Sequence, residues 1–179
     1  MTKKQKHYIN NADFLEALIE YKEKSKLAKK NKTELPPIPN YIGECFMKIA
    51  EGLSHKPNFI NYTYRDEMMS DGIENCLMYF DNFDPAKSKN PFAYFTQIIY
   101  FAFLRRIGKE KKQTYVKYKA TEQMGILDEF EMLENEDGTS RQFELYDNIA
   151  EFIETYEGTK KAKKDLANKA KGIEKFLGE

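Results

Sequence analysis

One segment of the chain combines side chains that stack on unpaired nucleic-acid bases with side chains that bind phosphates. Residues 92–107 (FAYFTQIIYFAFLRRI) are apolar on nearly every side of a helix, and a basic run follows directly. Each aromatic ring stacked on a base contributes about 1–3 kcal/mol, and nearby lysines and arginines neutralise the backbone. Aromatic residues at helical spacing more often belong to a core. A helix has only one inward face, however, so some of these rings should face solvent or a partner.

The residue types that enzymes use for catalysis are sparse in this chain. His7 and His55 are its two histidines, and neither lies at the spacing of a zinc site or of a nucleophile–base pair. No glycine-rich phosphate loop is present, and the carboxylates follow helix faces instead of pairing as acid and base. Cys45 and Cys76 stand far apart in helical patterns, which is typical of buried thiols in a reducing compartment. We therefore expect no enzyme activity, no metal and no cofactor.

The composition favours a soluble, all-α protein of the cytoplasm. Hydrophobic residues make up 41% of the chain and charged residues 32%, with only nine glycines among 179 residues. No stretch approaches the roughly 20 apolar residues of a membrane span, and the basic N-terminus lacks the apolar segment of a secretory signal. We therefore expect no membrane partner.

A formal net charge of zero conceals three charged blocks. Residues 104–119 contain seven basic side chains against one acidic side chain, and residues 120–158 contain twelve acidic side chains against one arginine. Residues 159–179 contain seven lysines against three acids. Solvated helix faces would account for any one block, but the abrupt alternation favours surfaces that meet different partners.

Apolar spacing predicts four helices before residue 119. The first begins near residues 11–13 and ends at the proline-rich loop 31–40, and the second carries an apolar stripe over residues 42–53. The third starts at a capping box formed by Thr63 and Asp66 and continues to about Phe80, with an inward face of Met68, Met69, Ile73, Leu77 and Phe80. The fourth runs from Phe92 to about Lys112. Residues 1–119 should form the folded body, residues 120–158 an acidic helical extension, and residues 159–179 a flexible basic tether.

Two consecutive segments resemble region 2 of bacterial sigma factors. Residues 67–83 (EMMSDGIENCLMYFDNF) are similar to the helix that binds core RNA polymerase, with Asp71-Gly72 and Asp81-Asn82-Phe83 at the corresponding positions. Residues 92–106 resemble the helix that reads and melts the −10 element. The stretch from about residue 10 to 119, including the string NPFAYFTQ, is closer still to the late-transcription sigma factors of T-even-type bacteriophages. The resemblance implies a sigma region 2-like helical bundle with an extended C-terminal tail that is helical or flexible.

The resemblance also implies a function in the cytoplasm of an infected bacterium. The protein would bind host core RNA polymerase and would recognise and melt an A·T-rich, −10-type late promoter. One set of residues would dock on the clamp coiled coil of the largest polymerase subunit: Glu67, Ser70, Asp71, Ile73 and Leu77. A second set would bind and open the promoter DNA, where a base is flipped from the stack: Lys87, Lys89, Phe92, Tyr94, Phe95, Ile98, Ile99, Arg105, Arg106 and Lys109.

The chain departs from primary sigma factors in two respects. Ile98 and Ile99 stand where those factors have a tryptophan pair, and the chain contains no tryptophan. Nothing after Lys119 resembles a helix-turn-helix that reads an upstream promoter element. In the phage family an apolar C-terminal peptide binds the DNA sliding clamp instead, and the resemblance gives this role to Ile173, Phe176 and Leu177. The resemblance leaves open whether a late-transcription coactivator is a further partner.

Two other classes of function fit parts of the pattern. The chain could be a helical protein-interaction module whose aromatic helix is simply its core, in which case it would not bind polymerase. It could also be a single-stranded DNA-binding protein that acts without polymerase, in which case it would bind any single strand tightly by itself. Neither alternative explains why a docking-helix pattern and a melting-helix pattern follow each other in this order.

Overall fold

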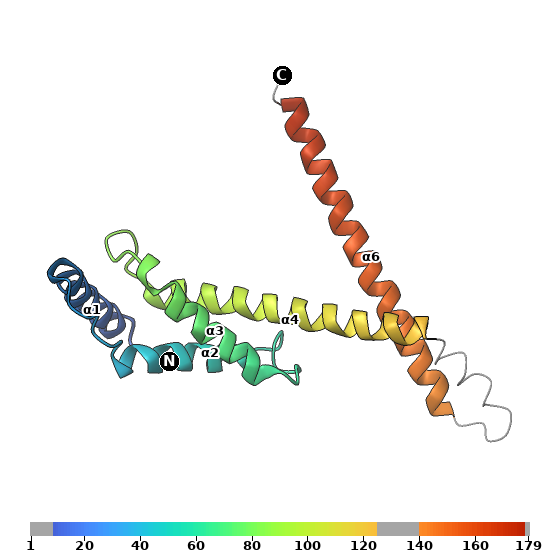
Figure 1. Cartoon of the computed structure of the whole chain (residues 1–179), viewed down its shortest axis with the longest axis horizontal. Helices are drawn as coiled ribbons and strands as arrows, with labels where there is room; N and C mark the ends of the chain where they lie inside the picture. Colours follow the sequence, from blue (N-terminus) through green and yellow to red (C-terminus); the bar gives the residue numbers. More distant parts are fainter. Residues whose placement is uncertain (1–8, 125–139, 178–179) are drawn as a thin grey trace, which may run out of the picture. The chain divides into compact units, whose positions relative to one another are not determined.

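The structure, a computed structural model, describes residues 9–124 and 140–177, and in the last helix it describes the side chains of residues 147–168. Within these ranges every regular element is a helix and no strand occurs, which confirms the predicted all-α class. The chain divides into two units, Met1–Gly108 and Lys109–Glu179. The boundary between these two units lies inside a continuous helix. Figure 1 shows the elements in chain order.

Helix α1 (Asn11–Asn31) has specific residues at both ends. Asn10 caps its start, because the Asn10 side chain accepts a hydrogen bond from the backbone N–H of Ala12. At the other end Lys32 adopts a left-handed conformation with φ of 55°, and its N–H bonds to the carbonyls of Ala28 and Lys29. The predicted proline-rich loop then leads to α2 (Asn40–Ser54).

Helix α3 (Arg65–Met78) starts later than predicted. Its N-cap position is Tyr64, which makes no capping hydrogen bond through its side chain, so the predicted capping box at Thr63 is wrong. The short 3-10 helix η1 (Phe80–Asn82) follows. Helix α4 (Pro91–Gln123) begins at a proline, whose fixed φ suits the first helical position, and Asn90 Oδ1 accepts the N–H of Ala93. It extends beyond the predicted end near Lys112, since no glycine or proline interrupts residues 113–123.

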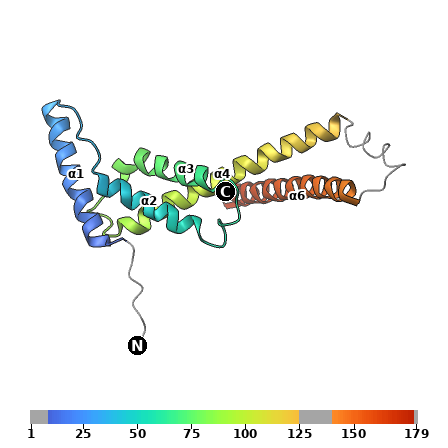
Figure 2. The ribbon, with the colours of Figure 1, turned by 90° about the horizontal axis from the view of Figure 1, so that it is seen from below.

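An aromatic cluster forms the core of the first unit. Phe95 of α4 lies at its centre, with ring centroids 5.7 Å from Phe14, 4.7 Å from Phe46 and 5.8 Å from Phe83. All four of these rings are fully buried. Figures 1 and 2 show α2, α3 and the first half of α4 side by side, with α1 across one end. The cluster therefore joins elements that are far apart in the sequence.

The second unit contains the last part of α4 and helix α6 (Ser140–Leu177). Tyr115 stacks on Tyr156 with ring centroids 4.5 Å apart, and Tyr118 meets Phe152 edge to face at 5.4 Å. The hydroxyl of Tyr115 donates to Glu157 Oε1 at 2.7 Å. Helix α6 includes residues 159–177, so the helical part of the predicted C-terminal extension continues past residue 158.

None of the helices described is long and apolar enough to span a membrane.

Candidate functional site

The two helices that resemble sigma region 2 lie in close contact because α3 carries a glycine at the crossing. A Cβ atom added at Gly72 would stand 2.9 Å from Cγ2 of Ile99 and 3.2 Å from Cε1 of Phe103. Both of these α4 residues are fully buried, so neither side chain has room to move aside. Gly72 therefore sets the distance between α3 and α4, which is a physical reason for a glycine at this position.

Polar contacts fix the same pair of helices at the edge of the crossing. Arg105 Nη2 donates to Asn75 Oδ1 at 2.7 Å, and Arg106 Nε lies 3.6 Å from Asp71 Oδ2. The Asn75 amide in turn donates to the backbone carbonyl of Asp71 at 2.6 Å. Asp71 was predicted to face polymerase, and Arg106 was predicted to face DNA. The structure instead pairs these two side chains with each other, so both contribute to the α3–α4 contact.

The outward face of α3 contains the other residues predicted to bind polymerase. Glu67, Ser70 and Leu77 are exposed, and Ile73 is half-buried. The sequence also placed Leu77 on the inward face, and that assignment is wrong, because 45% of Leu77 is exposed. Met78 and Tyr79 extend this apolar surface at the end of the helix, and sequence reasoning missed them. The predicted inward positions of Met68 and Phe80 are confirmed, and Gly72 and Cys76 continue the buried side of α3 from Met68 at a spacing of four residues.

Two residues predicted to meet the unwound DNA strand are core residues. Phe95 and Ile99 are fully buried, Phe95 inside the aromatic cluster and Ile99 against Gly72. Because neither side chain has exposed surface in this structure, neither offers a face on which a base could stack. Together with Phe103 they form the i, i+4, i+8 stripe by which α4 packs on the other helices.

Three other residues predicted to contact DNA are only partly buried. Phe92, Tyr94 and Ile98 pack against the core cluster but keep some exposed surface. The ring of Tyr94 lies 5.2 Å from that of Phe83, and burial raises the pKa of the Tyr94 hydroxyl above its ordinary value.

An exposed apolar strip lies on the opposite side of α4, and the sequence did not single it out. Phe101 is 47% exposed, Leu104 is 42% exposed and Tyr100 is 37% exposed. Tyr100 packs edge to face on Phe101 and on the buried ring of Phe59, which restricts its orientation. We call Tyr100, Phe101 and Leu104 the outer strip. The signal that could have identified it is the helical angle, because residues 101 and 104 lie opposite residues 95, 99 and 103.

Basic side chains accompany the outer strip. Arg105 is exposed and follows Leu104 directly. Lys87 and Lys89 are exposed in the loop before α4, where Lys87 lies 4.0 Å from Asp84 Oδ2. Lys109 is also exposed and begins the second unit. Within the first unit, an exposed cation therefore stands beside exposed aromatic surface.

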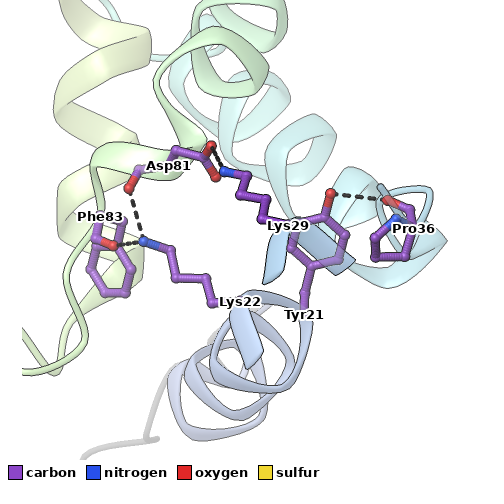
Figure 3. A network of polar contacts seen from close by, with 6 residues as sticks. All are labelled: Tyr21, Lys22, Lys29, Pro36, Asp81 and Phe83. Atoms are coloured by element: carbon purple, nitrogen blue, oxygen red, sulfur yellow. Dashed lines mark hydrogen bonds and ion pairs between the residues drawn. The ribbon is translucent and has the colours of Figure 1, made fainter. Parts of the chain in front are cut away.

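Helix α1 holds the segment that links α3 to α4. Lys22 donates its ammonium protons to the backbone carbonyls of Asp81, at 3.0 Å, and of Phe83 (Figure 3). Lys29 reaches the Asp81 carboxylate at 3.2 Å. Burial lowers the pKa of Lys22, mainly because its ammonium group is partly desolvated. The Asp-x-Phe segment singled out in the sequence is thus held in place by α1.

The predicted clamp-binding residues Ile173, Phe176 and Leu177 lie outside the side chains that the structure describes. Among the described residues, no group of three His, Cys, Asp or Glu side chains could hold a metal ion. The chain matches no protein-family model and shows no significant similarity to a curated protein. The features that indicate a function are therefore the two exposed surfaces of the α3–α4 pair and the sequence resemblance.

Proposed function

We propose that the protein is a sigma-like transcription initiation factor that binds bacterial core RNA polymerase and opens an A·T-rich promoter element. The observation that carries the proposal is that two adjacent helices present exposed faces of different chemistry while Gly72 and two arginine contacts hold them together. Helix α3 offers acidic and apolar side chains, and α4 offers aromatic, apolar and cationic ones. A factor that must hold polymerase and DNA together needs two such faces in a defined geometry.

The exposed face of α3 suits a helical partner. A helix that docks on a coiled coil needs an apolar stripe with charges beside it for register. Leu77 and Met78 supply exposed apolar surface, and Glu67 supplies a negative charge two to three turns earlier. Asp71 contributes indirectly in this proposal, by holding α3 against Arg106 of α4.

The outer strip of α4 suits unpaired bases. Phe101 and Tyr100 expose ring surface, and base–aromatic stacking contributes about 1–3 kcal/mol per base. Unstacking a base from the duplex costs a few kcal/mol, so two such contacts offset most of that cost. Arg105 supplies a cation for the adjoining phosphate. The proposal therefore moves the stacking surface from Phe95 and Ile99 to the outer strip.

The two alternative functions make different predictions. An interaction module whose aromatic helix is only a core would leave the outer strip without a role, whereas Phe101 and Leu104 are exposed. A single-stranded DNA-binding protein would use the outer strip but would not need the α3 face. Binding of this protein to core polymerase separates both alternatives from the proposal.

The test is co-purification with bacterial core RNA polymerase, followed by permanganate footprinting on a supercoiled A·T-rich promoter. We expect Glu67→Lys with Leu77→Arg to abolish polymerase binding, and Phe101→Ala to keep binding but reduce thymine reactivity by about tenfold or more, corresponding to one lost stacking contact. Met47→Arg is the matched control, because Met47 is 60% exposed on α2 and belongs to neither surface. Wild-type protein that binds no core polymerase would contradict the proposal.

Deletion of residues 173–179 tests the proposed sliding-clamp contact separately. If the C-terminal apolar residues bind the clamp, the deletion removes stimulation by the clamp and leaves clamp-independent opening unchanged. Loss of both activities would contradict this division of roles.

A further inference from the structure

Residues 158–168 of α6 contain closely spaced lysines. Among the α6 side chains that the structure describes, Tyr156 is the last that stacks on α4, and every residue from 158 to 168 is exposed. This exposed stretch contains Lys160, Lys161, Lys163 and Lys164 within five consecutive positions. Nothing in the described part of the chain covers these lysines.

The arrangement of these lysines opposes helix formation in the isolated protein. Lys160 and Lys164 are four residues apart, and Lys160–Lys163 and Lys161–Lys164 are three apart. Like charges at these spacings destabilise a helix by about 0.2–0.5 kcal/mol per pair. Two acidic residues flank the lysines, Glu157 three residues before Lys160 and Asp165 four residues after Lys161, so the four lysines keep an excess of positive charge. The lowered pKa of Glu157 is caused mainly by the hydrogen bond from Tyr115, with Lys119 contributing before Lys160. A polyanion bound along this helix would relieve the repulsion.

The composition and charge spacing of residues 158–168 indicate which class of polyanion they would bind. Leu166 is the one large apolar side chain among residues 158–168, so this stretch offers no apolar face to a membrane surface or to a groove on another protein. Five residues place four positive charges within about 6 Å of helix axis at 1.5 Å per residue. Duplex DNA carries about one negative charge per 1.7 Å of axis, or close to four in the same length, and a single strand carries about half that number.

We propose that residues 160–164 of α6 bind the phosphate backbone of duplex DNA without reading its sequence. This contact is separate from the opening of a promoter element and does not require polymerase. It would hold the second unit on double-stranded DNA through counterion release, so its strength should depend steeply on salt.

The test measures binding of the full chain to a 30-base-pair duplex without promoter sequence, at several salt concentrations and without polymerase. The test variant changes Lys161, Lys163 and Lys164 to Gln, which forms helix about as well as Lys. The matched control changes three exposed lysines of the first unit to Gln and so removes the same charge: Lys26, Lys30 and Lys56.

We expect the slope of log K against log salt concentration to become shallower by about 2–3 in the test variant, or about 0.9 per lost phosphate contact, and to stay unchanged in the control. A variant with Arg at positions 161, 163 and 164 should keep the wild-type slope, which excludes a folding defect as the cause. Equal slopes in the test and control variants would overturn the proposal. So would wild-type binding to anionic phosphatidylserine vesicles, or to single strands, that is as strong as binding to the duplex. Absence of duplex binding by the wild type would also overturn it and would leave the polymerase proposal untouched.

Discussion

Replacement of Phe95 by Ala separates the role that the sequence suggested for this residue from the role that the structure gives it. A residue that stacks on DNA should be replaceable at little cost to the fold. Phe95 is fully buried, and its ring meets those of Phe14, Phe46 and Phe83 within 6 Å. Truncation of a buried phenylalanine to alanine costs about 3–5 kcal/mol, which is a large part of the 5–15 kcal/mol that stabilises a typical domain. We therefore expect Phe95→Ala to destabilise the first unit strongly.

The matched variant is Phe101→Ala, on the same helix and with the same change of side chain. Full burial of a phenylalanine side chain contributes about 1.5–3 kcal/mol to the free energy of unfolding. Because Phe101 is 47% exposed, its truncation should cost about half of that, or about 1 kcal/mol. At a urea dependence of about 2 kcal/mol per M, the midpoint should fall by about 2 M for Phe95→Ala and by about 0.5 M for Phe101→Ala.

Thiol labelling gives a readout that is specific to the first unit. Cys45 and Cys76 are both buried there, so their reaction with a chromogenic disulfide during a urea titration reports unfolding of that unit alone. If Phe95→Ala kept the wild-type midpoint while promoter opening was lost, the reasoning from burial would be refuted. Phe95 would then have to leave the core when DNA binds.

Three further predictions concern the stability of the first unit. Gly72→Val should destabilise it by about 1–3 kcal/mol, because the added atoms overlap Ile99; an unchanged urea midpoint would contradict this. Lys22→Met should cost about 1.5–3 kcal/mol through loss of charged hydrogen bonds to the α3–α4 link, and proteolysis should then cut near residues 81–90. Burial raises the pKa of the Cys76 thiol from 9.0 to about 12, so its contribution to stability is complete below pH 9 and is lost between pH 9 and 12. Above pH 9 the urea midpoint should therefore fall more steeply with pH in the wild type than in Cys76→Ala. If the two midpoints fell equally with pH, the prediction that the Cys76 thiol is buried would be contradicted.

The sequence predicted the order of the first four helices well, because each is separated by a clear break. The proline-rich loop 31–40 and the apolar stripe over residues 42–53 are specific local signals, and both are confirmed. The capping box at Thr63 failed because a capping pattern shows only that a bond is possible, while the observed helix starts at Arg65. The length of α4 was underestimated because a change of charge along a helix is not a helix terminator.

The orientation of α4 could not be derived from the sequence. With apolar residues on nearly every side, periodicity does not show which side packs inward. The resemblance placed Phe95 and Ile99 toward DNA, and only the positions of α1, α2 and α3 reveal that these residues fill the core. The sequence also could not show that Leu77 is exposed, because an apolar residue on a docking surface looks the same in sequence as a core residue.

Helix α4 carries apolar side chains on nearly every side because its inner and outer faces have different roles. The inner side must fill a core shared with three other helices, which requires large apolar side chains such as Phe95, Ile99 and Phe103. The outer side carries Phe101 and Leu104, whose exposure brings no gain from burial in the isolated protein. Exposed aromatic surface beside Arg105 is therefore better explained by a partner than by folding. Substitutions along α4 should accordingly alternate with the helical period, with inner positions changing stability and outer positions changing promoter opening.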